Sequence, residues 1–308
     1  MKVVIIGAGI SGLYLAWKLA EKGARVTIFE KKEKIGKEVC SGLFSERILK
    51  FIPESKKLIQ NEIEYCLIHF PKRTLRIKFS TKFFVLNHYE LDRLVASLAK
   101  KSGAKIILSH PVHSAPEGFD RVIGCDGAMS QIRKNLGLED PKFYLGVQEF
   151  IFKEDNSNQV ETWPTKSGFI WRIPRGKEIE YGIIEKPNQA KKLFNEFLKE
   201  NNLHLKRINS ALIPQGLILP SNQEITLCGD AAGLTKPWSG GGVVWSLIAA
   251  EILLKNFPDF LKYKKEMEKF FLPKIIFSKM AKKIVYFLGF NFPWLLPKNF
   301  KIEGDFLI

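Results

Sequence analysis

The chain has few cysteines and no pattern that would tie them together. Only four occur among 308 residues, and they form no Cys-x-x-Cys pair: Cys40, Cys66, Cys125 and Cys228. A disulfide framework is therefore not expected, which fits a protein of a reducing cytosol. The five histidines are scattered, and His110 and His113 flank a proline-containing loop without nearby thiols, so no metal site is expected either.

Long apolar runs are also missing. No stretch reaches the roughly eighteen consecutive apolar residues that a membrane-spanning helix needs. The first apolar segment is short and leads directly into a glycine-rich turn, which is not the pattern of a secretory signal peptide. We therefore expect a cytoplasmic protein.

Acidic residues are too few to balance the basic ones. The sequence has 48 lysines and arginines against 32 aspartates and glutamates, a formal net charge of +16 at pH 7. A basic surface that meets anionic lipid or nucleic acid would explain the excess, as would the lysine-rich surface of a heat-stable protein. Nucleic acid is disfavoured, because no basic run interleaves with aromatic residues before the final quarter of the chain. We therefore expect no nucleic-acid partner.

A glycine-rich turn near the start is the clearest motif that the chain does have. The apolar run Lys2–Ile6 leads into Gly7-Ala8-Gly9-Ile10-Ser11-Gly12, which predicts a buried parallel strand turning into a helix. Gly7 makes the turn, Gly9 lets a pyrophosphate approach the backbone, and Gly12 lets the helix pack closely on the sheet. The spacing predicts a dinucleotide-binding βαβ unit.

An acidic residue follows at the distance that such a unit requires. Glu30 ends the expected second strand, about twenty residues beyond the glycines, where its carboxylate can accept hydrogen bonds from both ribose hydroxyls of an adenosine. We include the adjacent Lys31 in the same site. At this point the dinucleotide is either NAD or FAD.

A later strand end has a similar character. An apolar run ends in Asp126-Gly127, and Ser130 can cap the helix that follows. Asp-Gly also favours an ordinary turn, so this segment alone only adds Asp126 and Gly127 to the expected cofactor-binding residues.

The segment after Glu224–Cys228 favours one of the two dinucleotides. This expected strand leads into Gly-Asp, a proline and three glycines, after which a helix starts. Asp230 can accept hydrogen bonds from the hydroxyls of a sugar alcohol, while Gly241 and Gly242 let a helix N-terminus approach the edge of a flat ring. A nicotinamide enzyme has no use for this second site, whereas a positive helix end stabilises the anion of a reduced flavin. FAD is therefore the expected cofactor.

The remaining segments predict a second, strand-rich unit. Alternating polar and apolar residues from Glu62 to Val85, and strand-like runs between Phe143 and Pro220, are typical of antiparallel strands. We expect an α/β fold, in which a Rossmann-like FAD-binding domain carries a smaller antiparallel-sheet substrate domain and a helical C-terminus. The predicted boundaries are residues 1–62, 84–142 and 218–262 for the FAD-binding domain, 63–83 and 143–217 for the β-rich substrate domain, and 263–308 for a basic helical C-terminal segment.

Three separated segments together resemble the FAD-binding set of the para-hydroxybenzoate-hydroxylase-like flavoproteins. They are the fingerprint from Gly7 to Glu30, the Asp126-Gly127 segment and the Gly229–Ala232 segment. Within that superfamily the chain looks most like the geranylgeranyl reductases, above all the archaeal enzymes that saturate the prenyl chains of membrane lipids. The resemblance implies that Glu30 holds the adenosine ribose and that Asp230 holds the ribityl chain.

A short loop carries the closer resemblance to that family. Cys40-Ser41-Gly42 is similar to the family's Cys-Gly-x-Gly-like loop beside the isoalloxazine ring, and His88 stands where many relatives have an arginine four residues before Asp92. The implied reaction is hydride transfer from reduced FAD to a trisubstituted carbon–carbon double bond, with a proton delivered to the other carbon. Cys40 is the expected proton donor or positioning group, the alternative being that it only packs against the ring. The external electron donor and the carrier of the prenyl chain stay unknown.

A run of aromatic residues resembles the substrate motif of the same enzymes. Phe169-x-Trp171-x-Ile173-Pro174, followed by Gly182, is similar to Tyr-x-Trp-x-Phe-Pro…Gly-x-Gly, and Ile184 stands where the second glycine is expected. Aromatic residues on sheet faces usually belong to a core, but a sheet that faces a flavin can use them to line an apolar tunnel. The residues expected to contact an isoprenoid lipid substrate are Phe169, Trp171, Pro174 and Trp238.

The last quarter of the chain combines lysines with large aromatic residues. Its apolar run Ile284–Leu296 is broken by Asn291 and Pro293 and is too short to span a bilayer. Either it lies in a lipid interface, giving peripheral contact with an anionic membrane surface at the inner face, or it packs as ordinary core on the second domain.

Two other functions stay open. The same fold serves FAD-dependent monooxygenases of apolar or aromatic substrates, in which reduced flavin captures oxygen. A flavoprotein that only carries electrons would have no tunnel beside the ring. The aromatic motif favours the reductase over the monooxygenase.

Overall fold

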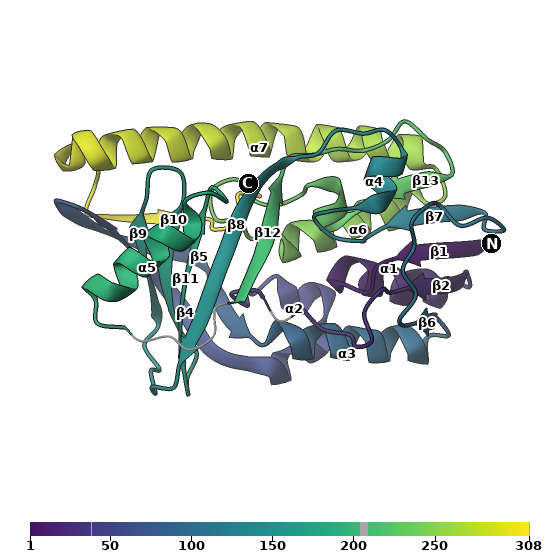
Figure 1. The fold of residues 1–308 in the computed structure, drawn as a ribbon, viewed down its shortest axis with the longest axis horizontal. Coiled ribbons are helices and arrows are strands. Elements are labelled where there is room, and N and C mark those ends of the chain that lie inside the picture. Colours follow the sequence, from purple (N-terminus) through teal and green to yellow (C-terminus); the bar gives the residue numbers. More distant parts are fainter. Residues whose placement is uncertain (38, 204–208, 308) are drawn as a thin grey trace.

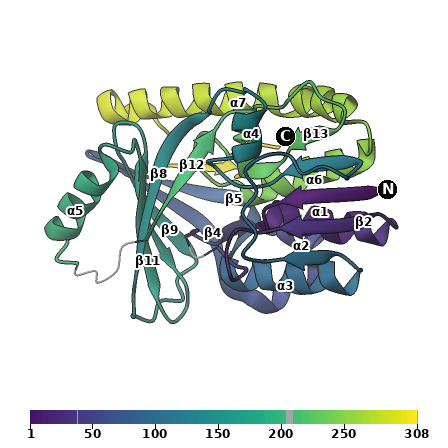
Figure 2. The ribbon, with the colours of Figure 1, turned by 45° about the vertical axis from the view of Figure 1, so that its right-hand side comes forward.

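The computed structural model describes residues 1–37, 39–203 and 209–307. It contains two β-sheets side by side, and the long helix α7 (Phe260–Asn291) runs along one edge of both (Figure 1). Helix α3 (His88–Lys101) lies at the opposite edge in both views (Figures 1 and 2). The fold is of the predicted α/β class.

The first sheet is parallel in the described residues and has the strand order β13-β7-β1-β2-β6. Val3, Val4 and Ile5 are all fully buried, as an unbroken apolar run predicts for a central parallel strand. Its strands are β1 (Lys2–Ile6), β2 (Arg25–Phe29), β6 (Lys105–Ile107), β7 (Arg121–Gly124) and β13 (Ile225–Leu227).

Helices and their caps complete this half of the molecule. Helix α1 is buried over most of its surface because it contacts both α3 and α6. The side chain of Asn87 caps α3, and Ser130 caps α4 by accepting a hydrogen bond from the backbone N–H of Arg133 (3.0 Å), as expected. The helices are α1 (Ile10–Glu21), α2 (Ile48–Phe51), α4 (Gln131–Asn135) and α6 (Val243–Asn256), with short 3₁₀ turns at Pro53–Leu58, Gly229–Ala232 and Pro293–Leu295.

The second sheet is mixed and curled. Its order is β12-β8-β11-β10-β9-β4-β5-β14, with β3 also paired to β5. Most neighbours are antiparallel, but β4 pairs with β9 in parallel and β5 pairs with β14 in parallel. The strands are β3 (Leu43–Ser45), β4 (Ile59–Phe70), β5 (Arg73–Leu86), β8 (Lys142–Ile151), β9 (Gln159–Pro164), β10 (Phe169–Pro174), β11 (Ile179–Glu185), β12 (Asn209–Gln215) and β14 (Asn299–Ile302).

Two helices enclose the second sheet. Helix α5 (Ala190–Glu200) packs on β8 and β11 through Phe194 and Leu198, which are one turn apart on its buried face. Helix α7 continues from the core of the first sheet to that of the second, where Val285 and Leu288 pack beside β4 and β5 residues. The two halves of the molecule therefore share one long helix.

The C-terminal segment is helical as expected but does not end as a helix. After α7 the chain adds the short strand β14 to the second sheet, which the sequence did not predict. Asp305 is then fully buried, where it accepts a hydrogen bond from the Lys236 ammonium (2.9 Å). Its backbone carbonyl accepts another from the Trp245 indole (2.8 Å). The last residues therefore join α6 to the second sheet.

Candidate functional site

One large cavity joins the two sheets. Its volume is about 1290 Å³, which exceeds the roughly 300–1,000 Å³ typical of a site for one drug-sized ligand. The lining starts at the glycine loop after β1, passes Cys40, and ends among the strands of the second sheet, α7 and β14. The space therefore suits a long ligand together with a second, apolar one.

The three glycines of the first loop have different surroundings. The backbone at Gly7 has φ +104°, and an added Cβ would lie 2.7 Å from the carbonyl carbon of Cys125. An added Cβ at Gly12 would overlap the carbonyl oxygen of Gly7. Gly9 lines the cavity and has open space on its Cβ side. Such surroundings are what a tight turn, close helix packing and an approaching pyrophosphate each require, although the contact with a ligand stays a prediction.

Glu30 follows β2 with its carboxylate turned toward the glycine loop. One carboxylate oxygen accepts a hydrogen bond from the backbone N–H of Ala8 (2.7 Å), and the other accepts one from the backbone N–H of Lys32 (2.9 Å). Both bonds fix the group in the cavity wall and leave lone pairs for ribose hydroxyls. Lys31 lies beside it, exposed and also in the lining.

Asp126 and Gly127 lie in the cavity wall after β7. One oxygen of Asp126, Oδ2, accepts hydrogen bonds from the backbone N–H groups of Gln131 (2.7 Å) and Ile132 (3.2 Å). The other, Oδ1, is buried without a hydrogen-bond partner among the described residues. Buried acceptors of this kind normally have a partner, so the site offers a place for a ligand donor.

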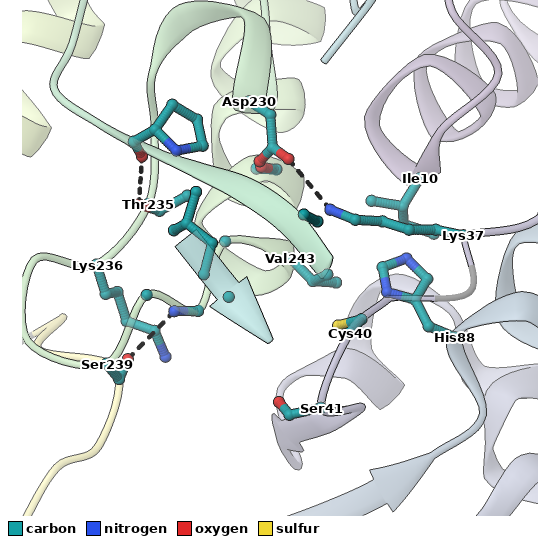
Figure 3. A pocket seen from close by; sticks show the side chains of 18 of the residues that line it. Ile10, Lys37, Cys40, Ser41, His88, Asp230, Thr235, Lys236, Ser239 and Val243 are labelled. Carbon is teal, nitrogen blue, oxygen red and sulfur yellow. Dashed lines mark hydrogen bonds and ion pairs between the residues drawn. The ribbon is translucent and has the colours of Figure 1, made fainter. Parts of the chain in front are cut away.

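Asp230 faces the cavity from the turn that follows β13. Its Oδ2 lies 3.2 Å from the ammonium nitrogen of Lys37, and Figure 3 shows this pair on the cavity wall. The negative charge of Asp230 raises the pKa of Lys37 above its ordinary value. Gly242 is the N-cap of α6, and an added Cβ there would lie 3.2 Å from Oδ1 of Asp230. Gly241 precedes it, so the N-terminus of α6 opens onto the cavity beside the carboxylate.

Cys40 lies on the cavity wall beside two groups from α3. Figure 3 shows the His88 ring next to Cys40, on the same side of the cavity as Lys37. Nε2 of His88 lies 3.3 Å from Oδ1 of Asp92, one helical turn further along. Burial raises the pKa of the Cys40 thiol, but the positive charges of His88 and Lys37 outweigh burial and lower it below the ordinary value.

The far end of the cavity is apolar. Phe169, Trp171 and Trp238 all line it, and their contact with a substrate stays a prediction. Pro174 lies outside this lining: it is buried at the end of β10, where its carbonyl accepts a hydrogen bond from the Asn61 amide (3.0 Å). Ile184 occupies part of the space that a glycine would leave open. The other apolar lining residues include Ile68, Ile77, Phe79, Phe83, Val160, Ile173, Ile213 and Val285.

A buried ion pair connects β10, which carries Trp171, to the loop that carries Cys40. The Trp171 indole donates a hydrogen bond to Glu180 (2.9 Å), whose other oxygen accepts one from Arg175 (2.7 Å). Arg175 also donates to the backbone carbonyl of Ser41 (2.7 Å). Burial raises the pKa of Glu180 to about 7, although Arg175 opposes that rise. The position of Cys40 therefore depends on the second sheet.

Helix α7 closes the apolar end. Lys282 and Tyr286 line the cavity and donate hydrogen bonds to the backbone carbonyls of Ser167 and Gly168, both at 2.8 Å. Burial lowers the pKa of Lys282 to about 8. No described helix, α7 included, has an apolar window long enough to cross a bilayer. Nor do three His, Cys, Asp or Glu side chains of the described residues come together as metal ligands would.

The residues present fit FAD. Gly9 has the open side that a pyrophosphate needs, and Glu30 and Asp230 each offer carboxylate oxygens to sugar hydroxyls. The buried, unpartnered Oδ1 of Asp126 and the α6 N-terminus border the same space. The cavity extends well beyond these groups, so a cofactor in this place would leave the apolar end free.

Several residues of the site were not predicted as such. Lys37, Asp92 and Lys236 line the cavity, and α7 contributes Lys282 and Tyr286. Asp92 had a sequence signal, because it lies four residues after His88 and so on the same helix face. Lys37 and Lys282 had none, since lysines are frequent throughout the chain.

Comparison with known proteins finds chains that are similar to this one. A family described as NAD(P)-binding Rossmann-like domain matches residues 5–42. A digeranylgeranylglycerophospholipid reductase of Methanococcus vannielii is 25% identical over 299 residues, covering 82% of this chain and 77% of the relative.

Solved structures resemble most of the chain. A geranylgeranyl bacteriochlorophyll reductase-like protein of Thermoplasma acidophilum has a TM-score of 0.81 and 20% identity, covering 92% of this chain and 86% of that one. The halogenase PltM in complex with FAD has a TM-score of 0.71 and 15% identity, covering 94% and 77%. The resemblance to geranylgeranyl reductases and the fold class are thereby confirmed, and the predicted FAD agrees with these comparisons.

Proposed function

We propose that this protein is an FAD-dependent reductase that saturates carbon–carbon double bonds in the prenyl chains of isoprenoid lipids. The observation that carries the proposal is the continuous cavity, which joins the glycine loop to an apolar chamber, with Cys40 between them. The chamber is the end of the cavity that Phe169, Trp171 and Trp238 line. The names of the similar proteins, one a reductase of digeranylgeranylglycerophospholipids, support the substrate class. We also propose the domain division given above, in which the second sheet supplies the chamber.

Residues of the first sheet's loops would hold the cofactor. Gly7, Gly9 and Gly12 would shape the pyrophosphate site, and Glu30 with Lys31 would bind the adenosine end. The other residues proposed to contact the cofactor are Asp126, Gly127, Asp230, Gly241 and Gly242. When bound and reduced, FAD supplies the hydride for the reaction. The lysines around the loop balance the two phosphates, since Lys31, Lys32 and Lys34 all line this end.

The apolar chamber would hold the prenyl chain. An isolated alkene has no oxygen for the protein to polarise, so the site must position the double bond and exclude water. Phe169, Trp171 and Trp238 provide flat apolar walls, and the buried Trp171–Glu180–Arg175 network keeps the indole in place. Pro174 lies outside the chamber, so we no longer place it in contact with the substrate.

Cys40 would deliver the proton. It lies in the cavity wall, and its sulfur accepts a hydrogen bond from the backbone N–H of Gly42 (3.5 Å). The positive charges of His88 and Lys37 stabilise the thiolate that remains after donation. A thiol with a stabilised conjugate base is a better general acid than an ordinary one.

We further propose that α7 rests on an anionic membrane surface. Ile276, Met280, Ile284 and Phe287 follow one helix face and are 54–58% exposed. The opposite side of the same helix lines the chamber through Ala281, Val285 and Tyr286, so a lipid chain has only one helix to pass. Exposed lysines flank the stripe at Lys265, Lys269, Lys279 and Lys283.

Flotation with vesicles tests the membrane contact. Vesicles that contain anionic phospholipid should carry the wild-type protein, and the double variant Ile276→Glu/Ile284→Glu should lose most of this binding. Phe152→Glu is the matched control, because Phe152 is 91% exposed away from α7 and its replacement should change nothing. Equal binding by all three proteins would rule the stripe out.

Lipid analysis tests the reductase function. Co-expression in a host that makes unsaturated archaeal-type ether lipids should yield saturated prenyl chains, and Asp230→Ala should yield fewer because the cofactor is held less well. The alternative, an FAD-dependent monooxygenase, predicts oxygenated products that require air. Unchanged lipids, in a strain with soluble flavin-containing protein, would contradict the proposal.

A further inference from the structure

Three polar side chains meet at the wall of the cavity where the two halves of the molecule join. Cys40 comes from the loop after β2, whereas His88 and Asp92 come from the first turns of α3. The His88 and Asp92 side chains are only 4% and 1% exposed. Two titratable groups so deeply buried in a cavity wall need a reason, because unpaired polar groups destabilise a fold.

The structure holds the imidazole in one orientation. Asp92 is fixed by the backbone N–H of Lys37, which donates to its Oδ2 (3.0 Å). Its other oxygen, Oδ1, lies 3.3 Å from Nε2 of His88. The Phe44 ring packs edge-on against the imidazole, with ring centroids 5.8 Å apart.

No described residue satisfies the imidazole by a well-formed hydrogen bond. Both of its nitrogens are buried without such a partner, although the ring lies in the cavity lining. Since Nε2 faces Asp92, Nδ1 is the nitrogen that remains for exchange of a proton with Cys40. A buried histidine without a hydrogen-bond partner, next to a cysteine in a cavity wall, indicates a residue with a role in the chemistry of the cavity rather than in packing alone.

The charges around the pair favour a shared proton. Burial lowers the pKa of His88, but the Cys40 thiolate and the Asp92 carboxylate outweigh burial and raise it to about 10. Two further ion pairs lie nearby: Lys37 with Asp230 (3.2 Å), and Arg175 with Glu180 (2.7 Å), where Arg175 also donates a hydrogen bond to the carbonyl of Ser41. The imidazolium therefore persists beside a thiol that ionises easily.

We propose that His88, oriented by Asp92, is a positioning residue that passes a proton to Cys40 during the reduction of the double bond. This inference rests on the proposed function for the destination of the proton, but the pairing of His88 with Cys40 can be tested without it.

The step balances in atoms and charge. One alkene carbon takes a hydride from the reduced cofactor, and the other takes a proton from Sγ of Cys40 as the π bond opens. The S–H bond breaks and leaves a thiolate, which the charge of the His88 imidazolium stabilises. Once the product leaves, a proton moves from Nδ1 of His88 to the sulfur, and a proton taken up from the solvent returns to His88, while Asp92 keeps its charge throughout.

The rate of alkylation of Cys40 tests the pairing directly. Purified, flavin-containing protein is treated with iodoacetamide over a range of pH, and modification of Cys40 is followed by peptide mass spectrometry. The other cysteines are buried, and Cys40→Ser gives the background. We expect the wild-type thiol to react with a pKa below the roughly 8.5 of a free cysteine.

Three variants decide the outcome. His88→Gln should raise the thiol pKa by about one unit or more, which slows alkylation about tenfold at neutral pH. Asp92→Asn should raise the thiol pKa by a smaller amount. This variant also tests the pairing if His88→Gln does not fold. His69→Asn is the matched control, because His69 pairs with Glu161 (3.0 Å) outside the cavity lining, and it should leave the thiol pKa unchanged.

Two results are decisive. An ordinary thiol pKa in the wild type, or one that neither His88→Gln nor Asp92→Asn changes, would overturn the pairing. With the pairing intact, His88→Gln should lower the rate of prenyl reduction with little change in KM for the lipid. If the wild type shows the thiol shift but reduces no prenyl chain, the proposed function fails and the pairing stands.

Discussion

Gly182 is the position at which one added methyl group should disturb the apolar chamber most specifically. It pairs with Trp171 across β10 and β11. An added Cβ would lie 2.5 Å from Cε2 of the Trp171 indole and 2.6 Å from the carbonyl oxygen of Val147. Because the carbonyl belongs to β8 and cannot move freely, Gly182→Ala should push the indole into the cavity.

Two terms set the size of the effect. Overpacking of this kind destabilises a fold by about 1–3 kcal/mol. Displacing the indole also removes the 2.9 Å hydrogen bond to Glu180 and leaves a buried carboxylate oxygen unpaired, which costs about 1–3 kcal/mol. We therefore expect Gly182→Ala to lower the free energy of unfolding by roughly 2–6 kcal/mol.

Urea unfolding, followed by circular dichroism, measures this change. Gly216→Ala is the control, since an added Cβ there meets only Pro141, at an ordinary 3.5 Å, and should alter stability by less than about 0.5 kcal/mol. Trp171→Leu should be less harmful in the Gly182→Ala background than alone, with a coupling of about 1–3 kcal/mol. If Gly182→Ala proves as stable as the control, or if the two changes are additive, the reasoning is wrong.

Two further predictions concern the cofactor loop and α7. Gly9→Val should fill the open side of the loop and abolish flavin retention, which visible absorbance measures. The melting temperature of the flavin-free protein should stay the same, because Gly9 has an extended backbone and no neighbour close to an added side chain. Lys282→Met should change how stability depends on pH. The folded pKa of about 8 lies below the ordinary 10.5, so the unfolded chain binds more protons between these values and wild-type stability rises there by roughly 1–3 kcal/mol. Urea unfolding at several pH values should show this rise in the wild type and in Lys279→Met, an exposed control on the same helix, but not in Lys282→Met.

Local patterns were enough to predict much of the first sheet. The strand β1, the glycine loop, α1 and Glu30 follow each other within thirty residues, so spacing alone placed them correctly. The Ser130 cap could be predicted for the same reason, because it acts on a backbone N–H only three residues away. Strand ends followed by Asp-Gly and Gly-Asp also indicated Asp126 and Asp230, which line the cavity and whose contacts with a cofactor stay predictions.

Contacts between distant segments could not be predicted. The strand β14 has only four residues, and its partner β5 lies more than two hundred positions earlier, so it has no local signal. The approach of His88 to Cys40 and the pairing of Lys37 with Asp230 likewise depend on how the loop after β2 folds across the cavity. Pro174 shows the opposite failure, because a motif position expected in the substrate site lies outside the cavity lining.

The most direct test of the central claim is a single turnover without oxygen. The purified protein is reduced with dithionite, freed of excess reductant and mixed anaerobically with a geranylgeranyl lipid. Flavin absorbance is recorded during the reaction, and the mass of the lipid is then measured by mass spectrometry. We predict that flavin becomes oxidised as the lipid gains two hydrogens for each double bond reduced. Flavin that stays reduced beside an unchanged lipid, or a product that forms only when air is admitted and carries an added oxygen, would contradict this account.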